Sequence, residues 1–178
     1  MFNTTKECYI MSTQTKTGLD QQTNDIIKAT VPVLEEHGTK ITKAFYQRMF
    51  EAHPELKNIF NQINQRKGEQ SKALAGAVYA AAKHIDQLET ILPTVKQISQ
   101  KHKSLSIQPE HYPIVGKYLL NAMKEVLGDA NEEVISAWER AYDVIASVFI
   151  ETEKGMYKEM TDTVGGWTGF RNFKVLKR

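Results

Sequence analysis

Apolar side chains recur every three or four residues from Leu19 to about Asp162, and glycine or proline interrupts the repeat at intervals. This spacing is typical of consecutive amphipathic α-helices, because residues three or four apart share one helix face. A chain of 178 residues can bury one substantial hydrophobic core but is short for two domains. The repeat therefore predicts an all-α protein with a single main domain.

Glycine and proline mark where the expected helices begin and end. We expect Gly38 to close a first helix and Thr39 to cap a second one, which Pro54 ends. The spacing predicts later helices at residues 69–86, 91–105, 109–128 and 131–160.

The two ends of the chain lack the helical repeat. Residues 1–18 are polar and rich in threonine, which predicts a disordered extension before the domain at 19–160. Residues 161–178 contain a glycine-rich turn followed by Phe173-Lys174-Val175, where apolar and polar side chains alternate as in a β-strand. We therefore expect a short linker and one strand fragment that lacks a partner strand.

Composition narrows the possible function classes. The chain has 23 basic and 21 acidic residues, a net charge of +2, which is too balanced for a nucleic-acid-binding surface. Its single cysteine, Cys8, excludes an internal disulfide and a thiolate cluster for zinc or iron–sulfur. No apolar run resembles a signal sequence or a bilayer span. We therefore expect a cytoplasmic protein with no nucleic-acid partner and no membrane span.

Two polar residues fall on apolar helix stripes. Glu153 has large apolar neighbours one turn before and after it, and His102 continues the stripe that begins at Ile91. A buried carboxylate needs a hydrogen-bond donor, and a metal-binding histidine normally donates its second N–H to a carboxylate. The spacing alone favours a core histidine–glutamate hydrogen bond, and a metal-bound His102 is the alternative. With one candidate imidazole, haem iron fits better than zinc, which needs three or four protein ligands.

Tyr46 and Gln70 raise a similar question on two other helices. Tyr46 adjoins the apolar stripe of Phe45, and Gln70 shares one face of an alanine-rich helix with Leu74 and Val78. Tyr46 and Gln70 are either boundary residues with polar ends in water, or hydrogen-bonding groups for a small ligand in an apolar cavity. The spacing leaves both interpretations open.

Several segments are similar to the globin domain of bacterial flavohaemoglobins: PELKNIFNQINQRKG (54–68), QKHKSL (100–105), HYPIVGKYLL (111–120) and AWERAY (137–142). The similarity covers about Leu19 to Tyr157. The segment GGWTGFRNFKVLK (165–177) resembles the join into the first strand of the FAD-binding barrel in the same family. The resemblance implies a globin fold, a three-over-three helical sandwich around haem, at 19–160 and the start of a truncated barrel at 161–178.

Position by position, the resemblance implies a haem site. His102 would be the proximal ligand and the only protein ligand to iron, and Phe60 would pack on the haem face. Tyr112 and Glu153 would form hydrogen bonds around that ligand. The distal residues, which would meet bound oxygen, are Tyr46, Gln70 and Leu74, and Leu74 and Val78 would keep the cavity small and apolar.

The resemblance also implies a function, the haem domain of a nitric oxide dioxygenase, which oxidises nitric oxide to nitrate with haem-bound oxygen. The implied cofactor is haem b, whereas FAD and NAD(P)H belong to the full-length protein and are not expected to bind here. The implied partners are oxygen, nitric oxide and a reductase domain or separate reductase, and we expect a monomer. Two alternatives are a single-domain globin that binds or transports oxygen and a helical sensor or interaction module without a cofactor. The flavin-barrel tail favours the dioxygenase.

Overall fold

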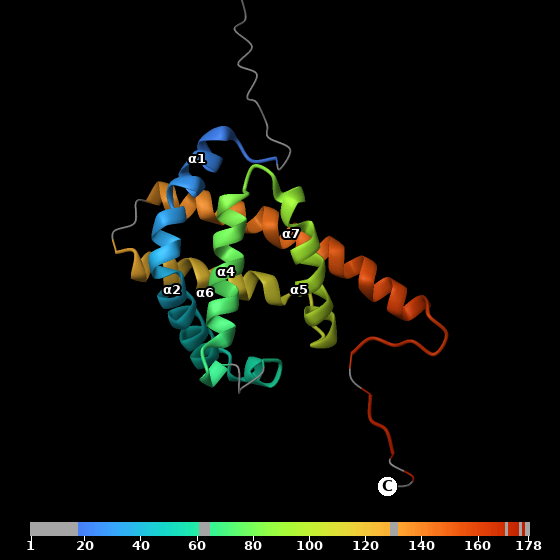
Figure 1. The fold of residues 1–178 in the computed structure, drawn as a ribbon. Coiled ribbons are helices and arrows are strands. Elements are labelled where there is room, and N and C mark those ends of the chain that lie inside the picture. The colour runs from blue at the N-terminus through green and yellow to red at the C-terminus, as the bar shows by residue number, and fades with distance from the viewer. Residues whose placement is uncertain (1–17, 61–64, 129–131, 170, 175, 177–178) are drawn as a thin grey trace, which may run out of the picture.

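The computed structural model describes residues 18–60, 65–128, 132–169, 171–174 and 176, and its regular elements are helices (Figure 1). The α-helices are α1 (Gln21–Ala29), α2 (Val31–Ala52), α4 (Glu69–Lys83), α5 (Leu92–Ser104), α6 (His111–Val126) and α7 (Glu132–Asp162). Two short 3-10 helices are η1 (Pro54–Asn58) and η2 (Leu88–Ile91). The predicted all-α class is confirmed.

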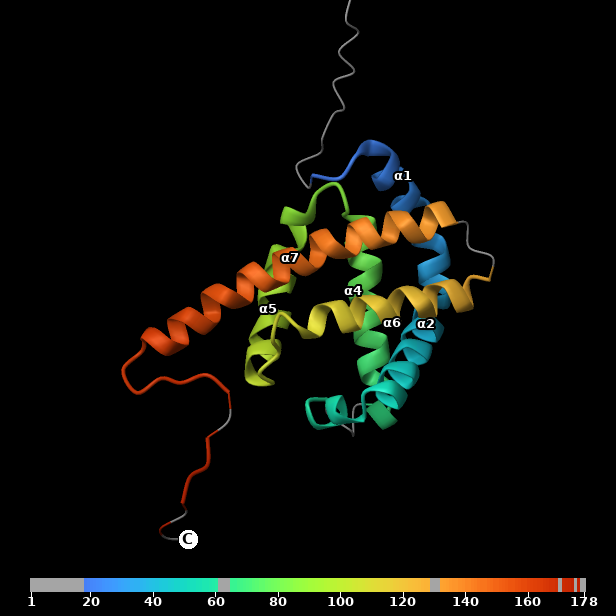
Figure 2. The same cartoon turned by 180° about the vertical axis from the view of Figure 1, so that it is seen from behind.

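The helices form two crossing layers. In Figure 1, α4 and α5 lie in front of α6 and α7, and Figure 2 shows the same layers from behind. Helix α2 packs against α4 and α6, whereas α7 packs against α1, α5 and α6. The core between them is apolar and includes fully buried side chains from four segments: Ile27, Ile41, Phe45, Met49, Ile85 and Met123.

The first helix boundary differs from the prediction. The break falls at Thr30, whose N–H and hydroxyl both donate to the Ile27 carbonyl, at 3.0 and 2.6 Å. Gly38 lies buried inside α2, where a Cβ would come within 3.4 Å of the Ala75 Cβ on α4. Thr39 is therefore a residue of α2 rather than its cap. Gly38 does not stop a helix; it lets α2 and α4 approach closely.

The crossing of α6 and α7 depends on a second close approach. A Cβ added at Gly116 would lie 2.5 Å from Cε1 of Tyr142. The Tyr142 hydroxyl donates to the backbone carbonyl of Tyr112 at 2.6 Å, so the ring has little freedom to move away. The Tyr142 ring can therefore occupy this position only because residue 116 has no side chain.

We expect Gly116→Ala to lower the free energy of unfolding by about 1–3 kcal/mol, because overpacking forces the Tyr142 ring or the helix to shift. Gly155→Ala on α7 is the matched control, since nothing lies within 4 Å of its added Cβ. The control should gain about 0.5–1 kcal/mol from the better helix propensity of alanine. Urea unfolding measures both, and equal effects of the two substitutions would contradict the prediction.

The segment after α7 has neither helix nor strand at the described positions 163–169, 171–174 and 176 (Figure 1). Phe173 and Lys174 form no strand here, since extended backbone without a partner strand has no ladder for its N–H and C=O groups, and the expected linker and strand fragment at 161–178 stays a prediction. Val175 lies outside the described residues, as do residues 1–17 of the predicted extension. Among the described residues, none of the helices combines the length and apolarity needed to span a bilayer.

Candidate functional site

Helix α5 ends just after His102 in a tight C-terminal turn. The Ile107 N–H donates to the His102 carbonyl at 3.0 Å, and the Ser106 N–H donates to the Lys103 carbonyl at 3.1 Å. Ser106 has a φ of +57°, so this is a Schellman turn with serine in the left-handed position that glycine usually takes. A left-handed non-glycine residue costs roughly 1–2 kcal/mol. The turn is therefore held by its surroundings, and it fixes the backbone of His102.

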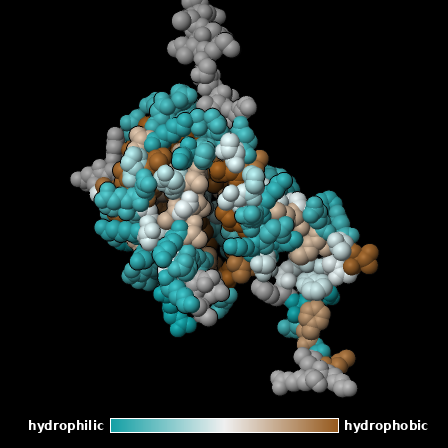
Figure 3. Space-filling view, viewed as in Figure 1, coloured by the Kyte–Doolittle hydropathy of each residue, from teal (hydrophilic) through white to brown (hydrophobic). Residues whose placement is uncertain are grey.

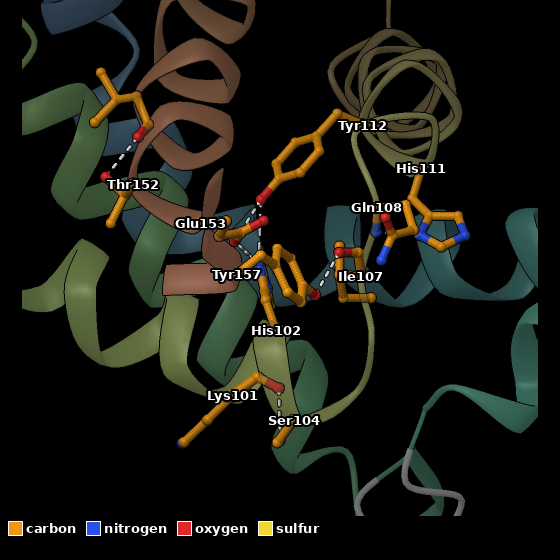
Figure 4. Close-up of polar contacts among 11 residues, drawn as sticks. Lys101, His102, Ser104, Ile107, Gln108, His111, Tyr112, Thr152, Glu153 and Tyr157 are labelled. Atoms are coloured by element: carbon orange, nitrogen blue, oxygen red, sulfur yellow. Dashed lines mark hydrogen bonds and ion pairs between the residues drawn. The ribbon is translucent and has the colours of Figure 1, made fainter. Parts of the chain in front are cut away.

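The His102 ring meets two residues from other helices (Figure 4). Nδ1 of His102 lies 2.7 Å from Oε1 of Glu153 on α7 and 3.2 Å from the hydroxyl of Tyr112 on α6. The Tyr112 hydroxyl donates to the same Oε1 at 2.8 Å. The structure thus brings together three of the residues selected from the sequence, one from each of three helices.

Glu153 is the only charged side chain in the buried core of the described residues, with 3% of its surface exposed. Two donors meet one of its oxygens, which offsets part of the cost of burying the carboxylate. Burial, and then the hydrogen bond and negative charge of Glu153, raise the pKa of Tyr112 above its ordinary range. Tyr112 therefore keeps its proton and remains a donor to Glu153.

The imidazole of His102 has one nitrogen left for a ligand. A carboxylate accepts but does not donate, so Nδ1 carries a proton, and in the neutral imidazole Nε2 is the nitrogen that presents a lone pair. The side chain is 29% exposed, so the ring is accessible from outside the core. Within the described ranges, no three His, Cys, Asp or Glu residues gather to hold a metal ion. The donor set thus fits a metal that takes one imidazole here and its other ligands from a cofactor.

A second group of selected residues surrounds Tyr46 on α2. The Tyr46 ring stacks on Phe50, with centroids 5.7 Å apart, and meets the edge of Phe60 at 5.8 Å. Burial raises the pKa of Tyr46 well above its ordinary range, although a hydrogen bond with Gln70 opposes the rise. Tyr46 is therefore a buried phenol that keeps its proton and is available as a donor.

Helix α4 supplies the other side chains of this group. Gln70 accepts a hydrogen bond from Nε2 of Gln65 at 2.8 Å. Leu74 and Val78 lie half-buried farther along α4 and pack against the apolar core. Figure 3 shows that the surface is hollowed between α4 and α5 and that apolar side chains lie in the hollow. The hollow separates the helix that carries Gln70 from the helix that carries His102.

The sequence did not single out three residues that the structure places at the site. The Phe149 ring lies 5.7 Å from His102, Tyr157 donates to the Ile107 carbonyl at 2.7 Å, and Gln65 contacts Gln70. Phe149 and Tyr157 stand one turn before and one turn after Glu153, so helical spacing from that carboxylate could have identified both. Gln65 precedes α4 and has no comparable spacing signal.

Two buried tyrosines, Tyr46 and Tyr112, and the partly buried Tyr142 lead us to expect a loss of stability at alkaline pH. Burial is the largest cause of the raised pKa of Tyr46, Tyr112 and Tyr142. An unfolded chain releases a phenolic proton near pH 10, so stability is fully present below about pH 10 and falls as pH rises toward the folded-state values. Each tyrosine adds up to about 1.4 kcal/mol of loss per pH unit.

Urea unfolding from about pH 8 to about pH 11 measures this loss. Tyr142→Phe should make the decline above about pH 10 less steep, because one of the three protons no longer takes part. A decline of the same slope in the variant would show that Tyr142 does not contribute.

Comparisons with known proteins place this geometry in a family. The family model described as Globin matches residues 43–149. The flavohemoprotein of Oceanobacillus iheyensis is 66% identical over 161 residues, which make up 90% of this chain and 40% of that protein. The chain spans about 40% of the length of the curated relatives it matches.

Two solved structures agree in fold. A bacterial globin from Campylobacter jejuni is 43% identical, with a TM-score of 0.75 over 78% of this chain and 99% of that chain. A flavohemoglobin from Malassezia yamatoensis, solved with bound FAD and heme, is 35% identical, with a TM-score of 0.73 over 79% of this chain and 38% of that chain. The expected globin fold is confirmed. The chain therefore belongs to the globin family, and it is similar to the globin domain of flavohemoproteins.

Proposed function

We propose that this chain binds haem b and that Nε2 of His102 is its single protein ligand to the iron. The observation that carries the proposal is the fixed state of the imidazole: Nδ1 is occupied by Glu153 at 2.7 Å, which leaves only Nε2 free. A histidine that ligates a metal normally has its other nitrogen oriented in this way. The flavohemoglobin of Malassezia yamatoensis, which contains heme, supports the proposal by its similarity.

We further propose that the domain serves a nitric oxide dioxygenase. The chemistry that haem supplies when bound is the uptake of oxygen and the oxidation of nitric oxide by that oxygen to nitrate. The similarity to flavohemoproteins, at 66% identity to one of them, supports this activity over oxygen transport alone. The electron donor would be a reductase domain or a separate reductase that uses FAD and NAD(P)H, and the chain would act as a monomer.

The protein side chains have distinct tasks in this proposal. Tyr46 holds a proton on its buried hydroxyl and donates a hydrogen bond toward a partly negative ligand, a preorganised electrostatic effect. Gln70 acts on the Tyr46 hydroxyl from α4 and partly opposes the rise in its pKa. Three half-buried apolar side chains pack against the core, and we propose that they exclude water and limit the size of the ligand: Phe60, Leu74 and Val78.

On the opposite side, Glu153 and Tyr112 act on the ligand histidine. Glu153 accepts a hydrogen bond from the Nδ1–H of His102 and so increases the electron density on Nε2. Tyr112 donates to the same carboxylate oxygen and orients it. The imidazole is therefore both positioned and made a stronger electron donor.

The experiment is a spectrum followed by a single turnover. The purified chain, loaded with haem and reduced, should show a Soret band that shifts when oxygen is added. Rapid mixing of the oxygenated protein with nitric oxide should yield one nitrate per haem and ferric protein. A chemical reductant or a separate reductase should restore activity. Reversible oxygen binding without nitrate would favour the single-domain oxygen-carrying globin, and absence of any haem spectrum would favour the module without a cofactor.

A further inference from the structure

Tyr157 links α7 to the turn that ends α5. It lies one helical turn beyond Glu153 on α7, and Figure 4 shows its ring beside Glu153 and His102. Its hydroxyl does not donate to Glu153; it donates to the backbone carbonyl of Ile107 at 2.7 Å. Ile107 is buried, so this carbonyl depends on a protein donor.

The same Ile107 is tied directly to His102. Its N–H donates to the His102 carbonyl at 3.0 Å, which is the long hydrogen bond of the Schellman turn. Between them stands Ser106 with its φ of +57°, a conformation that a residue other than glycine adopts only when its surroundings impose it. Tyr157 therefore holds the residue that closes the turn, from the same helix that carries Glu153.

We propose that Tyr157 is a positioning residue for the hydrogen bond between His102 and Glu153. Tyr157 on α7 holds Ile107 through this hydrogen bond, and so fixes the last turn of α5 relative to the carboxylate. This sets the distance between Nδ1 of His102 and Oε1 of Glu153. The effect is geometric because α7 contributes both the acceptor, at Glu153, and the clamp, at Tyr157. The inference rests on the proposed ligation of haem iron by His102.

The direction of the Tyr157 hydroxyl also limits the number of hydrogen-bond donors around the Glu153 carboxylate. Its Oε1 already accepts from His102 and Tyr112, and a third donor would weaken its pull on the imidazole proton. Tyr157 is within one turn of the carboxylate, yet its O–H is directed to Ile107. The clamp thus keeps a neighbouring hydroxyl away from the carboxylate while it positions the histidine.

The test is Tyr157→Phe, which removes the hydroxyl and keeps the ring. Two readouts are needed: amide hydrogen exchange at Ile107 in the haem-free chain, and the iron–histidine stretching band of the haem-loaded ferrous protein. Loss of one partly buried hydrogen bond should speed Ile107 exchange by about tenfold. The stretching band should broaden and move to lower frequency, by less than in Glu153→Gln, where the acceptor loses its charge.

Tyr118→Phe is the matched control, because Tyr118 on α6 is also half-buried but its ring contacts His53. It should leave both readouts unchanged. Faster exchange in Tyr157→Phe with a stretching band of unchanged position and width would overturn the proposal, since Tyr157 would then hold only the turn. Unchanged exchange at Ile107 would overturn it as well. Failure of the proposed function is distinct, because the unsubstituted chain would then show no iron–histidine band.

Discussion

His102→Ala should leave a folded chain that no longer retains haem. The substitution removes the one imidazole whose free nitrogen faces outward from the His102–Glu153–Tyr112 group, and no cluster of alternative ligands lies among the described residues. Without the coordinate bond, we expect the haem content after gel filtration to fall below about a tenth of that of the unsubstituted chain. The Soret absorbance per chain is the measurement.

Two controls make this result specific. His37→Ala replaces a half-exposed histidine on α2, whose Nε2 lies 3.7 Å from the carboxylate of Glu36, and should not change the haem content. Added imidazole should partly restore the spectrum of His102→Ala by occupying the vacated position. A His102→Ala protein with an unaltered haem spectrum would remove His102 from the proposed site.

Tyr46→Phe is expected to accelerate oxygen release from the haem-loaded protein by about one to two decades. A hydrogen bond to a partly charged ligand contributes roughly 1.5–3 kcal/mol, and its loss appears mainly in the dissociation rate. The ring remains, so the contacts with Phe50 and Phe60 persist. Rapid mixing with carbon monoxide measures the rate of oxygen release.

Gln70→Ala should have a smaller effect on oxygen release, because Gln70 acts on Tyr46 and the substitution leaves the donating hydroxyl of Tyr46 in place. Tyr118→Phe removes a hydroxyl on α6 and should leave the rate unchanged. Equal rates in the unsubstituted chain and Tyr46→Phe would mean that the Tyr46 hydroxyl does not contact the ligand.

Much of the fold follows from the helical repeat, but one boundary did not. Gly38 satisfies the usual rule for a helix end, yet it lies buried inside α2, with the Ala75 side chain of α4 beside it. This contact is tertiary, and local sequence does not contain it. The true break at Thr30 did have a local signal, since Pro32 stands in the first turn of α2, where proline is favoured.

The site shows the same division between local and tertiary information. The position of Glu153 among apolar neighbours predicted that it faces inward and needs a donor, and the structure supplies His102 and Tyr112. The clamp of Tyr157 on Ile107 was not predictable in this way. Its acceptor is a backbone carbonyl, which every residue has, so the pairing leaves no trace in residue type.

The contact between Gly116 and Tyr142 has a consequence for how this sequence can change. The two positions share one volume, so a larger residue at 116 is acceptable only with a smaller one at 142. A smaller residue at 142 would also remove the hydrogen bond that the Tyr142 hydroxyl donates to the carbonyl of Tyr112. A substitution at either position alone would therefore be unfavourable. A joint substitution would affect the backbone of Tyr112, whose side chain contacts His102. The two sites should therefore vary together or not at all.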